Sequence, residues 1–477
     1  MMDKRIKRLY RIKTELQLPR VKRLLTFFGF VIIGMLSSWI ILETTDYSPP
    51  VAYMTGILVT AALLWATEII PLFATSLLII GAQIILLGNP GEWGMLQTPG
   101  IAAIPYQSFL APLADPIIYL FLGGFILARV GVKVNVDVYL SSAMLRIFGL
   151  SAKSALLGVI VCTTIFGMWI SNTATTAMMI TLTASLLAFV PAGNTFRKGL
   201  TLAIPFSASI GGLMTPIGSP PNAIAVGLLA KDGVPIDFLT WMVIMFPLVV
   251  ILLFILFQLL WYRYKPETPL MLTPVETKPF GGEGIFVIIV FTITVLLWLT
   301  DSLHGIPSAV VALFPAIMFT ATGLLSVKEF NRIEWNILFV IAGGLALGQG
   351  MSLTGLDQVI ASSMPLESEW IVLIIFTTTL VVGTFMSNTT TAILFIPMAM
   401  SMAHQLEGVN VKFMAIGLAV MAGSSMALPI STPPNAIAYS SGELTSKDFI
   451  INGVVIGVCS LFITYVYFWL LTYFGLW

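Results

Sequence analysis

Residues 168–179 have the sequence MWISNTATTAMM and residues 385–396 have the sequence FMSNTTTAILFI, so both contain the cluster Ser-Asn-Thr. Each cluster interrupts a long apolar segment, at 155–190 and at 370–403. Both segments are too long for a single membrane span, which needs roughly 20 residues. A polar cluster in the middle of such a segment predicts two helices that meet at a polar tip, as in a re-entrant hairpin that enters the membrane from one side.

A second pair of motifs follows about 50 residues after each Ser-Asn-Thr cluster: TPIGSPPNAIA at 215–225 and LPISTPPNAIA at 428–438. Consecutive prolines remove backbone donors and clash with the preceding helical turn. We therefore expect the apolar segments at 199–231 and 411–442 to form discontinuous helices, whose freed carbonyls need partners. A simple proline kink is the alternative.

Two further matches show that the chain is a repeat. The tripeptide LLW occurs at 63–65 and at 296–298, and a Gly-Gly pair lies in FLGGFILA, around Gly123, and in VIAGGLALG, around Gly343. All four matches occur in the same order on either side of a polar linker at 262–284. The helix count places one hairpin inside and the other outside, which predicts repeats of inverted topology.

The composition places the chain in a membrane. Hydrophobic residues make up 58 % of it and charged residues only 9 %, whereas soluble domains carry about 25 % charged residues. The net charge of +1 gives no support for a nucleic-acid partner. The only cysteines, Cys162 and Cys459, lie in apolar runs and show no metal-ligand spacing, so we interpret them as packing residues.

The distribution of charge predicts the orientation. A strongly basic leader precedes the apolar run Leu24–Leu42, which is long enough to be a retained first helix with the leader in the cytoplasm. The predicted outer loops at 89–110 and 355–369 contain acids but no Lys or Arg. Lys231 and Lys412 are the exceptions to an otherwise positive-inside pattern.

The two Ser-Asn-Thr clusters are the strongest candidates for a binding site. Unpaired polar groups at membrane depth are costly, so they need partners or a water-filled cavity. Each cluster also begins the second helix of its hairpin, where free backbone N–H groups attract anions. Two such sites suit an anion with two carboxylates. The alternative is that these residues merely cap the helices, since Ser, Asn and Thr are favoured N-caps.

Several other activities lack their residues. No acid or base lies in the predicted core of a hairpin or broken helix, which argues against a proton relay. The chain has no Walker A motif for ATP, and neither the HExxH nor the GxSxG motif of a membrane hydrolase. We therefore predict that it is not an enzyme. A passive anion channel could use the same dipoles and hydroxyls, but it would show no counterflow.

At these motifs, from about residue 24 onward, the chain resembles the divalent anion/sodium symporter family of dicarboxylate, citrate and sulfate carriers. The resemblance implies a bacterial dicarboxylate transporter in the cell membrane: an all-α homodimer whose protomers have about eleven transmembrane helices and two re-entrant hairpins and work as elevators. It implies a leader over 1–23, a scaffold domain over 24–150 and 285–366, a transport domain over 151–262 and 367–477, and a cytoplasmic linker over 263–284.

The resemblance also implies the site residues. In this chain, the matching substrate-binding positions are Ser171, Asn172, Thr173, Ser387, Asn388, Thr389, Thr432 and Pro433. If transport is coupled to sodium, the matching cation-binding positions are Ser171, Asn172 and Gly218 for one site and Met386, Asn388 and Ser431 for the other. No organic cofactor is implied.

One departure from the family pattern bears on coupling. Sodium-coupled relatives commonly have a hydroxyl residue four positions before each Ser-Asn-Thr serine, and this chain has Gly167 and Gly383 there. A hard cation needs several oxygen ligands, so we favour exchange of C4 or C5 dicarboxylates such as succinate, malate, fumarate or 2-oxoglutarate. Sodium-coupled symport, with help from Thr164 or Thr384, and carriage of citrate or sulfate are the alternatives.

Overall fold

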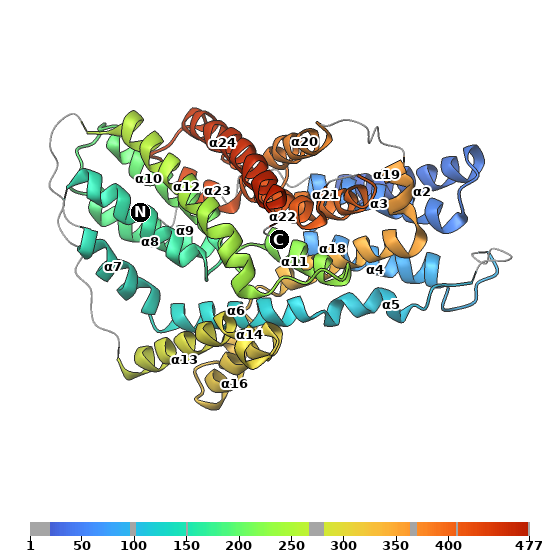
Figure 1. Ribbon diagram of the computed structural model, residues 1–477, viewed down its shortest axis with the longest axis horizontal. Helices are drawn as coiled ribbons and strands as arrows, with labels where there is room; N and C mark the ends of the chain where they lie inside the picture. The colour runs from blue at the N-terminus through green and yellow to red at the C-terminus, as the bar shows by residue number, and fades with distance from the viewer. Residues whose placement is uncertain are drawn as a thin grey trace. The chain divides into compact units, whose positions relative to one another are not determined.

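The computed structural model describes residues 20–95, 102–148, 151–266, 281–362, 370–406 and 409–475 (Figure 1). Within these residues every regular element is a helix. Residues 1–19 of the predicted leader and residues 267–280 of the predicted linker lie outside the described residues.

The chain divides into two compact units. The first comprises the described residues within Met1–Asp115, Phe339–Ser368 and Ile393–Gly408, and the second those within Pro116–Leu338, Glu369–Ala392 and Val409–Trp477. Two helices begin in the second unit and continue in the first: α18 (Trp335–Thr354) and α21 (Asn388–Ala403).

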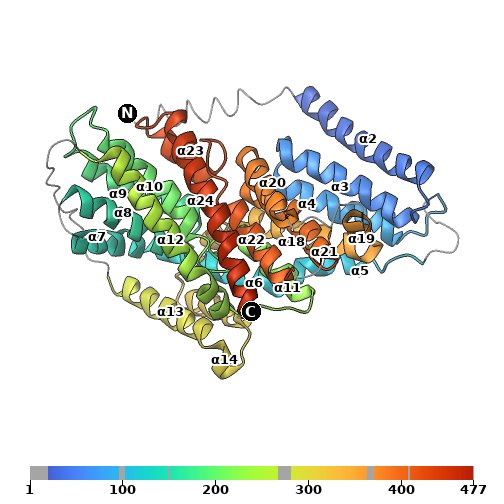
Figure 2. The ribbon, with the colours of Figure 1, turned by 45° about the horizontal axis from the view of Figure 1, so that its top comes forward.

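The other elements of the first unit are α2 (Arg20–Thr44), α3 (Pro49–Thr67), α4 (Leu72–Gln83), the π-helix η1 (Ile84–Gly88), α5 (Gln107–Leu110), the 3₁₀-helix η2 (Ala111–Ala114) and α19 (Leu356–Ser362). Helices α2 and α3 lie side by side (Figure 2). They cross where Gly34 and Gly56 meet, since a Cβ on either glycine would lie 2.5 Å from the carbonyl oxygen of the other. Gln83 of α4 donates a hydrogen bond of 3.0 Å to the Ala346 carbonyl of α18.

The second unit holds the remaining helices: α6 (Pro116–Lys133), α7 (Val136–Phe148), α8 (Ala152–Gly167), α9 (Asn172–Leu187), α10 (Phe196–Gly211), α11 (Pro220–Lys231), α12 (Phe238–Tyr264), α13 (Gly282–Leu299), α14 (Asp301–His304), α15 (Ser308–Val311), α16 (Leu313–Ala321), α17 (Val327–Phe330), α20 (Ile371–Phe385), α22 (Val411–Gly423), α23 (Pro433–Ser440) and α24 (Ser446–Tyr473). Helix α10 packs against α8, α9 and α12, and α22 packs against α11, α20 and α24 (Figures 1 and 2).

Helices α10 and α22 form the core of this unit. Every residue from Gly199 to Gly211 and from Phe413 to Gly423 is buried. A helix that is apolar or small on all sides must be surrounded by other helices. The second half-helices pack reciprocally, because α11 of the first repeat lies against α22 of the second, and α23 of the second lies against α9 and α10 of the first.

The repeated tripeptide LLW has the same role in both halves. Trp65 Nε1 donates a hydrogen bond to the Leu72 carbonyl (3.2 Å), and Trp298 Nε1 donates one to the Ser308 carbonyl (2.9 Å). Leu72 is the first residue of the next helix, α4, whereas Ser308 is the first residue of α15, which follows the short helix α14. Both indole rings are fully buried. Each tryptophan therefore bonds to the first residue of a helix that follows its own.

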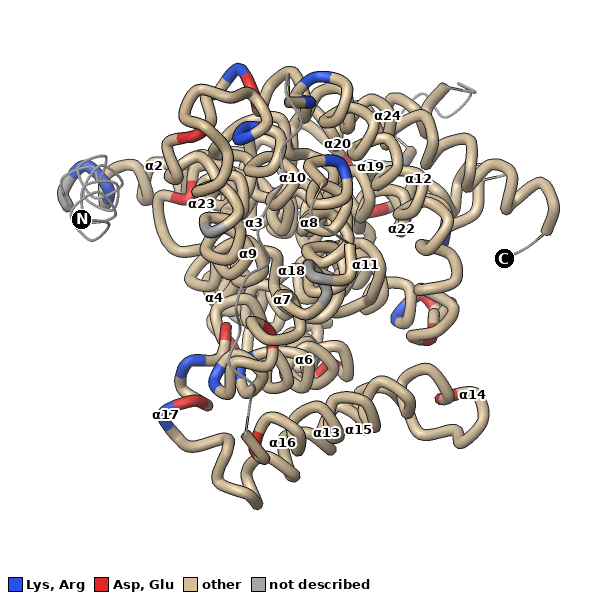
Figure 3. Tube along the Cα trace, turned by 90° about the vertical axis from the view of Figure 1, so that its left-hand side faces the viewer, with Lys and Arg blue, Asp and Glu red and all other residues tan. Residues whose placement is uncertain are grey.

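Seven helical segments of the described chain are long and apolar enough to cross a membrane: Lys22–Thr44, Pro49–Thr67, Gln107–Lys133, Phe238–Tyr264, Gly282–Leu299, Trp335–Thr354 and Ser446–Tyr473. Shorter apolar helices include α8, α20 and α22. Charged residues lie mostly at turns and helix ends (Figure 3). The chain is thus an all-helical, multi-pass membrane protein, while the count of about eleven spans and the inverted topology stay predictions.

The predicted interruptions are confirmed at all four motifs. The segment 155–190 divides into α8 and α9, and 370–403 divides into α20 and α21, each at its Ser-Asn-Thr cluster. The segments 199–231 and 411–442 divide into α10 and α11 and into α22 and α23. The proline loops are complete breaks and not kinks.

Candidate functional site

The first Ser-Asn-Thr cluster forms a helix N-terminus. Helix α8 ends at Gly167, Ser171 is the N-cap, and α9 begins at Asn172. The Ser171 hydroxyl accepts a hydrogen bond from the Ala174 N–H at 3.4 Å. The N–H groups of Asn172 and Thr173 belong to the first helical turn, where no helical carbonyl can reach them. Free N–H groups at a helix N-terminus attract anions.

The second cluster has the same geometry. Helix α21 begins at Asn388, and the Ser387 hydroxyl accepts a hydrogen bond from the Thr390 N–H at 3.3 Å. The Ser387 and Thr390 hydroxyls are also 2.7 Å apart. Thr389 lies in the first turn and is half-buried. Both serines are therefore N-caps, as the sequence allowed, and the first-turn N–H groups stay available for a ligand.

Each proline loop is closed by its asparagine. Asn222 Nδ2 donates to the carbonyls of Gly212 (2.8 Å) and Thr215 (2.7 Å). In the second repeat, Asn435 Nδ2 donates to the carbonyls of Met426 (2.8 Å) and Leu428 (2.9 Å). These bonds satisfy carbonyls that the helix break releases.

The prolines begin the second half-helices. Pro220 and Pro433 are the first residues of α11 and α23, where a missing N–H costs nothing. Thr432 is the N-cap of α23 and accepts from the Asn435 N–H at 3.2 Å. Thr432 is buried, whereas Pro433 is exposed.

A hydroxyl of each proline loop bonds to the hairpin of the same repeat. Thr215 Oγ1 donates to the Met168 carbonyl, and Ser431 Oγ donates to the Thr384 carbonyl, both at 2.6 Å. Met168 and Thr384 each lie three residues before a Ser-Asn-Thr serine. Each proline loop therefore bonds to its hairpin at the same distance before the serine. The loop residue that makes the bond differs between the two repeats.

Gly212 brings the first tip and its loop into contact. A Cβ on Gly212 would lie 2.6 Å from Asn172 Oδ1 and 3.0 Å from the Gly218 carbonyl oxygen. Two of the three residues predicted for the first cation site, Asn172 and Gly218, thus both lie beside Gly212. Ser171 is adjacent in sequence, but its hydrogen bonds go elsewhere.

Five asparagine side-chain oxygens are buried without a hydrogen-bond donor among the described residues, and four of them belong to the motifs: Oδ1 of Asn172, Asn222, Asn388 and Asn435, the fifth being Asn452 in α24. The four in the motifs form two corresponding pairs, one in each repeat. A buried amide oxygen without a donor is rare and calls for a water or ion partner. Carbonyl oxygens are suitable ligands for a hard cation, so the residues present fit a sodium ion as a transported co-substrate.

The second predicted cation site is less fully assembled. Ser431 is bound to Thr384, two residues before Met386, and Asn388 carries one of the four free amide oxygens of the motifs. The structure brings the Ser431 loop to the hairpin in this way. Among the described residues, no hydrogen bond joins Ser431 directly to Asn388 or Met386.

The structure gives a steric reason for the two glycines that depart from the family pattern. A Cβ on Gly167 would lie 2.9 Å from the Ala208 carbonyl oxygen, so α8 and α10 touch there. A Cβ on Gly383 would lie 2.5 Å from Ser425 Oγ. A larger residue would therefore collide at either position. At Gly383 the close neighbour is the hydroxyl of Ser425, two residues after the end of α22, which donates to the carbonyls of Leu380 and Met421.

Sequence reasoning missed one residue at the first tip. Ser171 Oγ donates a hydrogen bond of 3.0 Å to Glu334 Oε1, a carboxylate 163 residues away that directly precedes α18. The expectation that no acid lies in the core of a hairpin or broken helix holds for the sequence of those segments. Only the tertiary fold brings an acid from another segment to the tip.

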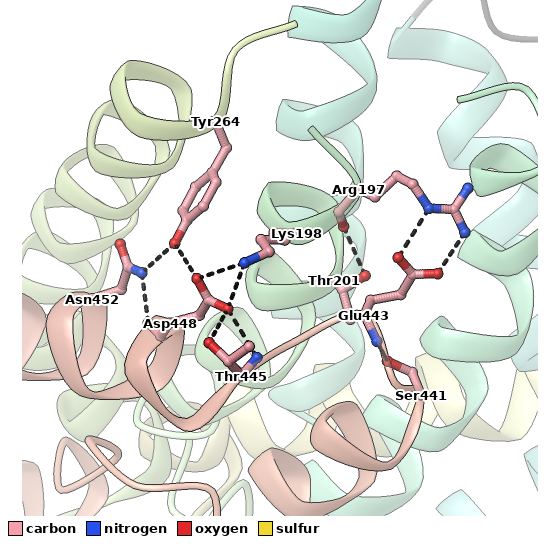
Figure 4. Close-up of polar contacts among 9 residues, drawn as sticks. All are labelled: Arg197, Lys198, Thr201, Tyr264, Ser441, Glu443, Thr445, Asp448 and Asn452. Atoms are coloured by element: carbon pink, nitrogen blue, oxygen red, sulfur yellow. Dashed lines mark hydrogen bonds and ion pairs between the residues drawn. The ribbon is translucent and has the colours of Figure 1, made fainter. Parts of the chain in front are cut away.

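A network of charges joins the start of α10 to the start of α24 (Figure 4). Lys198 Nζ lies 3.0 Å from Asp448 Oδ2, and Asp448 also accepts from the Thr445 N–H at 2.9 Å. The Tyr264 hydroxyl, at the end of α12, bonds to both Asp448 and Asn452. A second pair, Arg197–Glu443, lies beside it (Figure 4), and the Arg197 hydrogen bond lowers the pKa of the Glu443 carboxyl.

Replacing Asp448 with alanine is expected to destabilise this unit by about 1–2 kcal/mol, because it removes a capping-box carboxylate and the partner of Lys198. The thermal unfolding midpoint of the purified protein in detergent measures the change. Asp46→Ala is the control, since Asp46 is exposed. Equal midpoints for the two variants would contradict a stabilising role for Asp448.

Comparisons with known proteins place the chain in context. Residues 21–476 match the family described as the sodium:sulfate symporter transmembrane region. The chain is 31 % identical over 446 residues to the inorganic phosphate transporter PHO87 of Saccharomyces cerevisiae, covering 89 % of the chain and 47 % of that protein. It is 29 % identical over 452 residues to the sodium-dependent dicarboxylate transporter SdcS of Staphylococcus aureus, covering 86 % of the chain and 84 % of that protein.

The chain spans about half the length of PHO87 and of a similar uncharacterized transporter from Schizosaccharomyces pombe. Among solved structures, the YdaH transporter of Alcanivorax borkumensis is similar in fold. Its TM-score is 0.53 at 14 % identity, and the match covers 85 % of this chain and 98 % of that one.

Proposed function

The chain belongs to the sodium:sulfate symporter family, and we propose that it is a secondary active transporter of C4 or C5 dicarboxylates, such as succinate, malate, fumarate and 2-oxoglutarate. The observation that carries this proposal is the pair of Ser-Asn-Thr helix N-termini, Ser171 to Thr173 and Ser387 to Thr389. Each offers first-turn N–H groups, which attract anions, and an asparagine oxygen that has no hydrogen-bond donor among the described residues.

Two separate N-termini suit two separate carboxylates. A small tetrahedral oxyanion such as sulfate needs only one such site, and citrate has three carboxylates for the two N-termini, so sulfate and citrate carriage are the weaker alternatives. Transport of inorganic phosphate, the substrate in the name of one relative, is also a weaker alternative. The Asn172 and Asn388 side-chain N–H₂ groups would donate to the substrate, together with the Thr173 and Thr389 hydroxyls. Thr432 and Pro433 would line the remainder of the site.

Exchange is the favoured mode of coupling. The Gly167 and Gly383 positions supply no side-chain oxygen, and close packing against Ala208 and Ser425 leaves no space for one. Sodium-coupled symport is the alternative, and the four free asparagine oxygens of the motifs favour it. In that case Ser171, Asn172 and Gly218, and Met386, Asn388 and Ser431, would hold the ions. The relative SdcS is named as sodium-dependent.

The architecture proposed for this activity is a homodimer in the cell membrane with a cytoplasmic N-terminus. The scaffold would comprise 24–150 and 285–366, and the moving transport domain 151–262 and 367–477. Both hairpins and both proline loops fall within the proposed transport domain. The bonds Thr215–Met168 and Ser431–Thr384 would keep tips and loops together while the domain moves.

The deciding experiment is uptake of radiolabelled succinate into proteoliposomes. We expect uptake that requires unlabelled dicarboxylate inside and does not respond to an inward sodium gradient, because an empty transport domain would have to cross with unneutralised anion sites. Uptake into empty vesicles that is driven by sodium would instead establish the symporter. A lack of saturable succinate uptake under all these conditions would contradict the proposed substrate class.

A further inference from the structure

The first tip already holds a carboxylate. Ser171 Oγ donates a hydrogen bond of 3.0 Å to Glu334 Oε1, and both residues belong to the second compact unit. Glu334 lies in the turn before α18 and is half-buried. A carboxylate of the protein itself is therefore hydrogen-bonded to the serine that caps the proposed anion site.

The cations around Glu329, five residues before Glu334, have other partners than Glu334. Arg129 Nε lies 2.6 Å from Glu329 Oε2, and Arg332 lies 3.8 Å from Glu329 Oε1. Lys133 donates to the Leu324 carbonyl at 2.7 Å. Within the described ranges Glu334 forms no ion pair, and Ser171 is its hydrogen-bond partner. Burial raises the pKa of the Glu334 carboxyl, and the hydrogen bond from Ser171 offsets part of that rise.

This arrangement differs from that of Glu329, only five residues earlier. Burial alone would raise the pKa of Glu329, but the Arg129 hydrogen bond and the charges of Arg129, Arg332 and Lys133 lower it overall. Glu329 is thus a neutralised structural acid. Glu334 has no such compensation and is bonded to a residue of the proposed site.

We propose that Glu334 is an internal competitor of the substrate, which binds Ser171 in the empty carrier and is displaced when a substrate carboxylate reaches the N-terminus of α9. The proposal rests on the proposed function. Two carboxylates at one helix N-terminus repel each other, so substrate binding and the Ser171–Glu334 bond oppose each other. Substrate affinity is lower than it would be without Glu334.

The Ser171–Glu334 hydrogen bond would also explain why transport requires substrate in both directions, as in exchange. It ties the tip of the first hairpin to the turn before α18. While it persists, α9 cannot move away from the start of α18. In the empty carrier, the Ser171–Glu334 hydrogen bond keeps the transport domain from moving. In the loaded carrier, the substrate has displaced Glu334 and the domain can move. Glu334 would therefore be a coupling residue that suppresses the return of the empty transport domain.

The experiment compares wild type with Glu334→Gln in succinate-loaded and empty proteoliposomes. Glutamine keeps the shape of the side chain but removes its charge. We expect the KM for succinate in exchange to fall about tenfold, which corresponds to loss of roughly 1.4 kcal/mol of repulsion. We also expect net uptake into empty vesicles to appear, because the neutral amide oxygen accepts the Ser171 hydrogen bond more weakly than the carboxylate does. A residue that only stabilised the fold would lower the maximal rate and would not improve KM.

Glu283→Gln is the matched control, because Glu283 is an exposed acid in the first turn of α13. It should keep the wild-type KM and the requirement for internal dicarboxylate. If Glu334→Gln does not reconstitute, Glu334→Asp serves instead: it keeps the charge, but it is one methylene too short to reach Ser171. It should also permit net uptake.

The outcomes separate the two proposals. If the wild type exchanges succinate and the Glu334 variants keep its KM and its dependence on internal dicarboxylate, the role of Glu334 is wrong and the proposed function stands. If the wild type does not transport succinate at all, the proposed function fails and the role of Glu334 fails with it.

Discussion

Asn172→Ala should reduce dicarboxylate transport by on the order of 10- to 100-fold while the protein remains inserted in the membrane. Asn172 is the first residue of α9, and its side-chain oxygen is buried with no hydrogen-bond donor in the part of the chain that the structure describes. Alanine removes both the amide donor proposed for a substrate carboxylate and this oxygen. Loss of a polar partner in a buried site costs about 1–3 kcal/mol, and about 3 kcal/mol corresponds to about 100-fold.

Asn388→Ala should have the same effect, because Asn388 begins α21 in the second repeat and its oxygen is also free. Initial rates of succinate exchange, normalised to the amount of reconstituted protein, provide the measurement. Asn331→Ala is the control, since Asn331 is exposed and lies outside both tips. Near-normal exchange by both Asn172→Ala and Asn388→Ala would show that the site has been misplaced.

Gly212→Ala is expected to reduce dicarboxylate transport by a similar factor, because the added methyl group has no space. The added methyl would lie 2.6 Å from Asn172 Oδ1 and 3.0 Å from the Gly218 carbonyl oxygen. Such separations force the Asn172 side chain or the proline loop to shift. Overpacking of this kind costs typically about 1–3 kcal/mol, and here the group displaced belongs to the proposed binding site.

Gly131→Ala is the matched control for Gly212→Ala. Gly131 lies in α6, and a Cβ there would meet no atom within 4 Å. It should leave exchange and the thermal unfolding midpoint close to wild type. Wild-type KM and rate in Gly212→Ala would show that the contact between Asn172 and the proline loop is not needed for transport.

The sequence alone was sufficient to predict the membrane class and the four interruptions. Apolar segments too long for one helix, with Ser-Asn-Thr or Pro-Pro-Asn inside them, divide at those motifs in the structure. This succeeds because capping and proline effects are local: Ser171 and Ser387 bond to N–H groups three residues away, and Pro220 and Pro433 can only begin a helix. The paired motifs also identified the family.

The tertiary structure decided what lies beside these motifs. Glu334 reaches Ser171 across 163 residues, Thr215 and Ser431 bond to different hairpins from unequal positions in their loops, and Gly212 touches Asn172. The spacing of residues in the sequence does not predict these contacts, because contacts between distant segments depend on how whole helices pack. Local motifs in the chain are enough to place the helix ends at the proposed site, whereas helix packing brings together the acid, the hydroxyl and the glycine that meet there.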